Sequence, residues 1–224
     1  KELKKMEVDS ALYVGNLKFN RAKIQKREKY NNKKLINYLG VDKCIVFGST
    51  WGRDEEIIFD YVSEEINKNM KYIIAPHEVS EKNISRIKSK LNNKVNLLSD
   101  ITYNVQNNVL IVDSIGVLKY LYEFSNISYV GGGFKKNGLH NILEPCAYGN
   151  PVIFGKYFKF SNEAKALIKL KGGFSIQNSI QLKNTINGLL LNANKLKEIE
   201  IINSKFIDDN LASINSIIKS MQNE

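Results

Sequence analysis

The 224-residue sequence contains little cysteine and proline, and no long apolar run. Its two cysteines, Cys44 in an apolar segment and Cys146 after a proline, are too few for a disulfide framework or a four-ligand zinc site. We therefore expect both to be buried thiols. Three prolines, at positions 76, 145 and 151, leave no proline-rich linker that would divide the chain.

Membrane-spanning and signal sequences are not evident either. Mean hydropathy is −0.29, no apolar run approaches the roughly 18 residues of a membrane span, and residues 1–9 lack the apolar stretch of a signal peptide. These features predict a soluble, cytoplasmic domain. The first residue is Lys1 rather than methionine, so we expect the chain to be a piece of a longer or processed protein.

Positive charge exceeds negative charge, with 33 Lys and Arg against 23 Asp and Glu, a net charge of +10. Such an excess favours nucleic acid, an anionic membrane or a phosphorylated ligand as partner. Much of it is lysine scattered among asparagines, however, which is typical of solvated surface. The charge by itself does not choose among these readings.

Apolar content of 43% is enough for a sizeable core, and its spacing indicates the fold class. Short runs rich in β-branched residues predict buried strands at 44–47, 72–75, 109–112, 127–130 and 151–154. Segments of helical period alternate with them, at about 53–67, 80–91, 116–124, 141–148 and 162–171, the last ended by Gly172 and Gly173. This alternation predicts an α/β fold with a Rossmann-like, doubly wound parallel sheet.

Two further segments flank this series. Residues 1–43 contain one strand-like piece, Leu12 to Val14, and a lysine-rich helical stretch, and residues 179–224 are helical in period. We expect residues 1–224 to form a single domain.

Small and polar residues follow four of the predicted strands. Ligands of open parallel sheets bind at the carboxyl ends of the strands, so these loops are expected to converge on one rim. They comprise residues 48–51, 76–78, 113–116 and 131–141.

The longest loop, 131–141, holds four glycines and leads into a predicted helix. Its free N–H groups and the helix dipole predict an anion site, most plausibly for phosphate, although a flexible surface loop has the same composition. The loop matches neither a Walker motif nor GxGxxG. Lys135 and Lys136 either add positive charge to this anion site or are solvated surface residues.

Several polar residues on this rim have both a ligand-binding and a structural interpretation. Glu144, in the first turn of the helix after the loop, either accepts ribose hydroxyls or caps the helix, and Asn141 is a ligand contact or an N-cap. The only histidines, His77 and His140, are phosphate or carboxylate donors or structural residues. Ser49 and Thr50 bind an anion or cap the helix near Arg53. No Ser/His/Asp, Cys/His or HExxH arrangement is present.

Six segments, in this order, resemble one family. They are YVGNLKFN at 13–20, GSTW at 48–51, IAPHE at 74–78, VGGGF at 130–134, GLHNILEP at 138–145 and GNPVIFG at 149–155. Together they resemble the C-terminal half of the transferases of 3-deoxy-D-manno-octulosonic acid (Kdo), which build lipid A and the lipopolysaccharide core. The resemblance covers about residues 12–173, and its most specific element is His-Asn-x-x-Glu-Pro within a glycine loop.

The resemblance implies a GT-B architecture, in which an N-terminal domain, absent from this chain, faces the inner membrane and takes the lipid A precursor. The C-terminal domain binds the donor, CMP-Kdo. It implies no cofactor, no metal and no nucleic-acid partner, and a location at the cytoplasmic face of the inner membrane. It also implies that the general base belongs to the missing half, so that this chain is inactive alone.

Site residues are implied by the same resemblance. Pro76 and His77, together with Ser114, Ile115 and Gly116, would border the cytosine. Glu144 would bind the ribose. The phosphate and the Kdo carboxylate would be bound by Ser49, Thr50 and the loop that contains Gly132, Gly133, Gly138, His140 and Asn141.

The sequence departs from the family at three points. Many members have Arg in place of Pro76, Met-Gly-Glu in place of residues 115–117, and Gly-Pro in place of Gly155-Lys156. These departures fall mainly on the cytosine side, and a variant branch with Pro-His-Glu fits better. Two other interpretations remain open at this stage: a GT-B donor domain that uses a UDP-sugar, and a basic module without catalytic function that binds nucleic acid or membrane.

Overall fold

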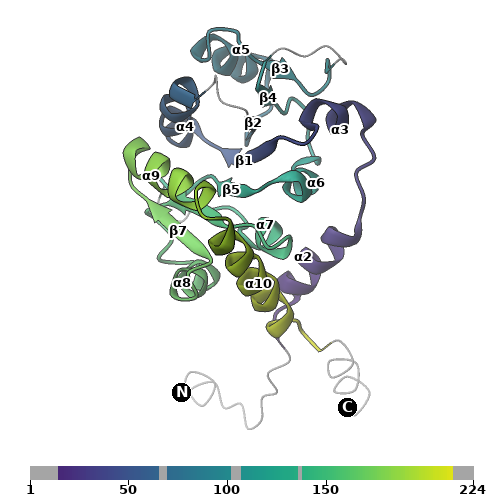
Figure 1. Ribbon diagram of the computed structural model, residues 1–224, viewed down its shortest axis with the longest axis vertical. Helices are drawn as coiled ribbons and strands as arrows, with labels where there is room; N and C mark the ends of the chain where they lie inside the picture. The colour runs from purple at the N-terminus through teal and green to yellow at the C-terminus, as the bar shows by residue number, and fades with distance from the viewer. Residues whose placement is uncertain (1–14, 66–69, 102–106, 136–137, 214–224) are drawn as a thin grey trace, which may run out of the picture.

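The computed structural model describes residues 15–65, 70–101, 107–135 and 138–213. In this part of the chain seven strands form one sheet, in the order β3-β4-β2-β1-β5-β6-β7, and every neighbouring pair is parallel (Figure 1). The strands are β1 (Lys43–Thr50), β2 (Met70–Pro76), β3 (Asn96–Leu97), β4 (Val109–Ile111), β5 (Ile127–Val130), β6 (Val152–Gly155) and β7 (Gly173–Ile176). The predicted α/β fold with a doubly wound parallel sheet is confirmed.

Helices cover both faces of the sheet. They are α2 (Leu17–Arg27), α3 (Lys33–Leu39), α4 (Gly52–Glu65), α5 (Glu81–Lys90), α6 (Leu118–Leu121), the 3-10 turn η1 (Tyr122–Phe124), α7 (Leu143–Ala147), α8 (Asn162–Lys169), α9 (Ser179–Leu190) and α10 (Ala193–Asp209). In the part of the chain that the structure describes, no helix is long and apolar enough to cross a bilayer.

Alternation along each strand divides the core between the two faces. Ile45 and Phe47 of β1 pack with α4, α5 and α9 on one face. Val46 packs with α3 and α6 on the other face, where α2, α7, α8 and α10 cover Val152 and Phe154 of β6. Because both faces of β1 are buried, residues 44–47 are all apolar, and this pattern allowed the strand to be predicted from the sequence.

The direction of sheet growth reverses between β1 and β5. From β1 the chain passes through α4 to β2 on one side, whereas from β5 it passes through α7 to β6 on the other side. Loops at the carboxyl ends of two such neighbouring strands diverge and leave room for a ligand.

Five predicted strands coincide with β1, β2, β4, β5 and β6, and the predicted helices with α4, α5, α6 with η1, α7 and α8. The lysine-rich stretch contains α2 and α3, and the C-terminal segment contains α9 and α10. The strand-like piece from Leu12 to Val14 lies outside the described residues. Both cysteines are buried, as expected.

Three expectations about local structure are wrong. Strands β3 and β7 were not expected, because β3 has two residues and β7 has an exposed serine in a four-residue run. Gly173 does not simply end the preceding helix but begins β7. The helix expected at 141–148 spans only five residues, 143–147, so its dipole is short and contributes less to anion binding than expected.

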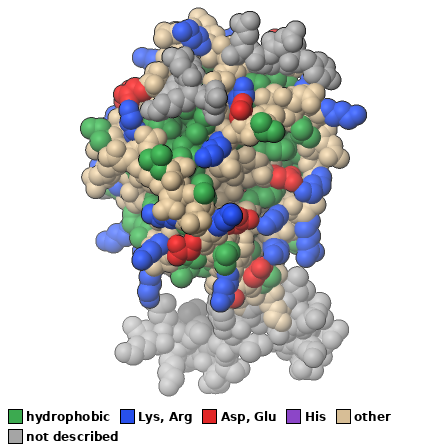
Figure 2. Space-filling view, viewed as in Figure 1, with side chains coloured by type: hydrophobic (Ala, Val, Ile, Leu, Met, Phe, Trp, Pro, Cys, Tyr) green, Lys and Arg blue, Asp and Glu red, His purple; other side chains and the backbone are tan. Residues whose placement is uncertain are grey.

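Lysine and arginine do not gather in one patch on the face shown in Figure 2. They are spread over it and interspersed with Asp and Glu. This distribution agrees with the interpretation of the +10 charge as largely solvated surface.

Candidate functional site

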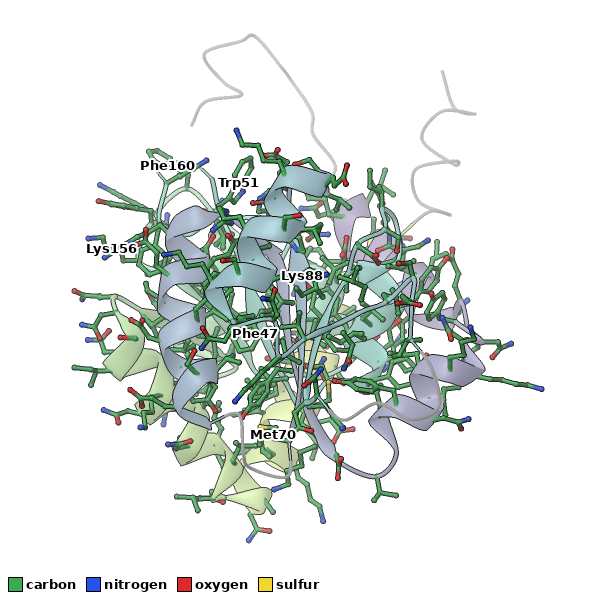
Figure 3. All side chains as sticks on the ribbon, turned by 90° about the horizontal axis from the view of Figure 1, so that it is seen from above. Phe47, Trp51, Met70, Lys88, Lys156 and Phe160 are labelled. Carbon is green, nitrogen blue, oxygen red and sulfur yellow. The ribbon has the colours of Figure 1, made fainter. Side chains whose placement is uncertain are left out.

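The loops that follow β1, β2 and β5 meet at the carboxyl edge of the sheet, at the switch point. Figure 3 shows this direction: Met70, where β2 begins, lies at one edge of the molecule, and Trp51, directly after β1, lies at the opposite edge. The loops are bound to one another by backbone hydrogen bonds, from His77 to Thr50 (2.9 Å), Gly131 to Gly48 (2.8 Å) and His140 to Gly131 (3.1 Å). The rim predicted from the sequence therefore contains residues that are distant along the chain.

A buried carboxylate connects these loops. Asp54, in the first turn of α4, is 1% exposed and accepts three hydrogen bonds. The donors are the backbone N–H groups of Trp51 and Gly132, both at 2.9 Å, and the hydroxyl of Tyr129 at 2.6 Å. Asp54 raises the pKa of Tyr129 further above its usual range, although burial is the larger cause. The Asp54 carboxylate thus fixes the glycine loop against β1 and β5.

Three aromatic rings form a stack beside this carboxylate. The indole N–H of Trp51 donates to Nε2 of His140 at 2.8 Å, and the two rings are almost parallel, 11° apart. His77 stacks on both, with ring centroids 4.2 Å from Trp51 and 4.5 Å from His140. The ammonium of Lys135 lies 3.6 Å from the centre of the Trp51 ring, a cation–π contact.

The hydrogen bond from Trp51 determines the tautomer of His140. Because Nε2 accepts this hydrogen bond, the neutral ring carries its hydrogen on Nδ1. Burial lowers the pKa of His140, and the neighbouring His77 and Lys135 lower it too, against the opposite effect of Asp54. His140 is therefore a neutral N–H donor at neutral pH.

Glu144 is half-buried in α7. The amide of Asn141 donates to one of its carboxylate oxygens at 3.1 Å, and the other oxygen has no hydrogen-bond partner among the described residues. Burial raises the pKa of Glu144, and the charges of Arg21 and Lys119 partly offset this effect. Its negative charge in turn helps to raise the pKa of Tyr122, which burial raises most.

Asn141 provides a cap-like hydrogen bond at the start of α7, whereas Glu144 does not cap this helix in the manner expected. The residue at the N-cap is Ile142, without a side-chain cap, while the Asn141 side chain accepts from the N–H of Leu143 at 3.1 Å. Glu144 is held by Asn141 rather than by a backbone N–H at the helix start. The capping interpretation of Glu144 is thus not the geometry found.

Glycines of the 131–141 loop are required by packing within the protein. A Cβ on Gly132, whose φ is +86°, would lie 1.9 Å from the carbonyl oxygen of Gly138, and one on Gly133 would lie 2.5 Å from the N of Gly155. The N–H of Gly132 is already bonded to Asp54. The loop is therefore a tightly packed turn, and this N–H is not available to an anion.

The other residues predicted for the site differ in their burial. Thr50 and Pro76 are buried, and the Thr50 hydroxyl donates to Glu55 at 3.2 Å. Ser49 is half-buried with φ of +52° at the irregularity that ends the pairing of β1 with β2. The loop of Ser114, Ile115 and Gly116 is exposed on the same edge, after β4, two strands away from β1.

A hollow of ≈450 Å³ opens on this edge. Among the described residues predicted for the site, His140 and Asn141 line this hollow. Its other walls come from α2, from the end of the glycine loop with the start of α7, and from the segment after β6. These residues are Lys18, Arg21, Leu139, Ile142, Leu143, Tyr157, Phe158, Phe160, Ser161 and Glu163.

Sequence reasoning missed the two residues that organise the rim. Asp54 lies beside Glu55 and Glu56 at the start of α4, and only Glu56 of the three is exposed. Trp51 was noted within a motif and not assigned to the site. Its position, the only tryptophan of the chain at the end of a buried strand, was a signal that pointed to it.

A parallel sheet with its polar loops at a switch point defines the class: the fold is the Rossmann-like α/β fold found in domains of GT-B glycosyltransferases. No family model matches the sequence. The chain is 33% identical over 218 residues to the Kdo transferase of Rickettsia prowazekii, and the match covers 92% of the chain. The resemblance to Kdo transferases is thereby confirmed.

Two other comparisons agree with this assignment. A bifunctional glycosyltransferase/methyltransferase of Fusobacterium nucleatum is 35% identical over 215 residues, 92% of the chain and 32% of that protein. The solved C-terminal CMP-Kdo binding domain of WaaA from Acinetobacter baumannii superimposes with a TM-score of 0.67 at 21% identity, covering 85% of this chain and 98% of the domain. The chain spans only 46% of the R. prowazekii protein.

Proposed function

We propose that this chain is the donor-binding domain of a Kdo transferase and binds CMP-Kdo at the rim between β1 and β5. The observation that carries the proposal is the position of Glu144. Glu144 lies in α7, which follows the loop after β5, and one of its carboxylate oxygens has no hydrogen-bond partner among the described residues, in a chain homologous over 92% of its length to Kdo transferases. A carboxylate there can accept two ribose hydroxyls.

In this proposal the nucleotide lies over β1 with its base toward β2 and β4. Pro76 and His77, with the exposed loop of Ser114 to Gly116, border the cytosine. His140 donates from Nδ1 toward the phosphate, with Lys135 supplying positive charge nearby. Thr50 is omitted from the ligand contacts because its hydroxyl is bonded to Glu55.

Nucleotide selectivity tests this proposal. We expect isothermal titration of the purified chain with CMP, CTP, UMP and UDP to show binding of the cytidine nucleotides and at least about tenfold weaker binding of the uridine nucleotides. Preference for UDP would indicate a donor domain for UDP-sugars. Absence of any nucleotide binding would contradict the proposal.

Transfer itself requires a second domain in this proposal. The other part of the longer protein would bring the lipid A precursor and the general base to the donor, at the cytoplasmic face of the inner membrane. We expect the chain, incubated with CMP-Kdo and lipid A precursor, to give no product by mass spectrometry, whereas the intact protein does. Enzyme-dependent transfer by residues 1–224 alone would show that the base lies within them.

A further inference from the structure

The hollow of ≈450 Å³ beside the glycine loop combines positive charge with exposed aromatic rings. One wall is the N-terminal half of α2, with Lys18 and Arg21. The opposite wall follows β6 and contains Tyr157 and Phe160, which are 39% and 77% exposed. Figure 3 shows Phe160 at the same edge of the molecule as Trp51, the edge of the candidate site.

Arg21 lacks a partner in the described part of the chain. It is exposed, and it forms no side-chain hydrogen bond or ion pair there. Lys18 has only a weak ion pair: its side chain is 73% exposed, and its ammonium lies 3.9 Å from the carboxylate of Glu163. Exposed ion pairs at such distances contribute little, so both cations can bind an anion at low cost.

The hollow is continuous with the proposed nucleotide site. His140 and Asn141 line it, and the charge of Arg21 reaches Glu144, whose pKa it lowers against the effect of burial. A ligand whose phosphate lies at His140 therefore extends into the hollow if it is larger than a nucleotide.

We propose that this hollow binds the sugar acid of the donor, with its carboxylate on Arg21 and Lys18 and its ring against Tyr157 and Phe160. Guanidinium matches a carboxylate in bidentate geometry, and aromatic walls with a few placed polar groups are typical of small-ligand sites. The inference rests on the proposed function. It moves recognition of the carboxylate from Ser49 and Thr50, which the resemblance implied, to α2.

The test compares CMP-Kdo with CMP on Arg21→Gln, on Lys18→Gln and on the double variant. Arg27→Gln is the matched control, because Arg27 is an exposed residue of the same helix that does not line the hollow. We expect Arg21→Gln to bind CMP-Kdo about tenfold or more weakly, since a charge-assisted hydrogen bond contributes one to two orders of magnitude in affinity. Lys18→Gln should lose less. The affinity for CMP should stay within about twofold in all variants.

The outcomes separate the two proposals. Unchanged CMP-Kdo affinity in the double variant, with CMP still bound, overturns the assignment of the hollow and leaves the nucleotide site standing. An equal loss of affinity for CMP and for CMP-Kdo in Arg21→Gln places Arg21 on the nucleotide and also overturns the assignment of the hollow. Failure of the unsubstituted chain to bind either compound overturns the proposed function and this inference together. Melting temperatures of all variants are measured alongside, and we expect them to match, because the substituted side chains are exposed.

Discussion

The two halves of the rim are built differently. The half at β1 and β5 is held by the buried Asp54 carboxylate and by glycines that pack backbone against backbone. The half at α2 and the segment after β6 exposes Arg21 and Phe160, which have few partners. One half is therefore stabilised by internal hydrogen bonds, whereas the other exposes charge and aromatic surface.

Removal of the buried Asp54 carboxylate should abolish the difference between the two halves of the rim and have the largest effect on stability. We expect Asp54→Ala to lower the free energy of unfolding by about 3 kcal/mol, because it leaves the Tyr129 hydroxyl and two backbone N–H groups without their acceptor. Urea unfolding measures the loss. Glu56→Ala, an exposed neighbour in the same helix turn, is the control and should change stability little. Equal losses in both variants would show that Asp54 does not organise the rim.

Two glycines with the same backbone conformation separate close packing from backbone strain. Gly132 and Gly116 have φ of +86° and +87°, but a Cβ on Gly116 meets nothing within 4 Å. We expect Gly116→Ala to cost about 1 kcal/mol from strain alone. Gly132→Ala should cost at least about 2 kcal/mol, since the loop must also move away from Gly138. Thermal unfolding of both variants checks this, and similar losses would mean that the loop is not tightly packed.

Glu144 is half-buried and one of its carboxylate oxygens is unpartnered among the described residues, so its substitution should affect binding rather than folding. We expect Glu144→Gln to weaken CMP binding by about 1 to 3 kcal/mol, if the carboxylate accepts ribose hydroxyls, and to leave the melting temperature nearly unchanged. Calorimetric titration and a thermal scan provide the two readouts. Lower stability with unchanged CMP affinity would instead indicate a structural role.

The smallest effect concerns the protonation of His140. Its pKa is lowered in the folded chain, so its protonation favours the unfolded state. The contribution of this group to stability is present above the unfolded pKa of about 6.5 and is lost as pH falls through the lower folded value.

Trp51→Phe should raise the pKa of His140. The substitution removes the N–H that occupies Nε2, and a proton then enters this position more easily. Titration of the His140 ring protons by NMR in the unsubstituted chain and in the variant measures the change. An unchanged or lower pKa in the variant would show that the indole does not control the tautomer.

Local patterns were sufficient for much of this molecule. Cys44 to Phe47 and the other buried runs identified the central strands because strands covered on both faces are apolar throughout. Placement of His77 and His140 on one rim followed, since all parallel strands end at the same edge. Strands β3 and β7 escaped because two to four residues with partial exposure carry no periodic signal.

The amino-acid sequence was enough to predict the α/β class, the central strands, the loops of the rim and the resemblance to Kdo transferases. Only the tertiary structure decided that Asp54 is buried, that Trp51 donates to His140 across 89 positions of sequence, and that Arg21 faces the same hollow as Phe160. The physical reason is distance along the chain. Periodicity reports the environment of neighbouring residues, whereas a hydrogen bond or a hollow between remote segments exists only after the sheet has brought their ends together.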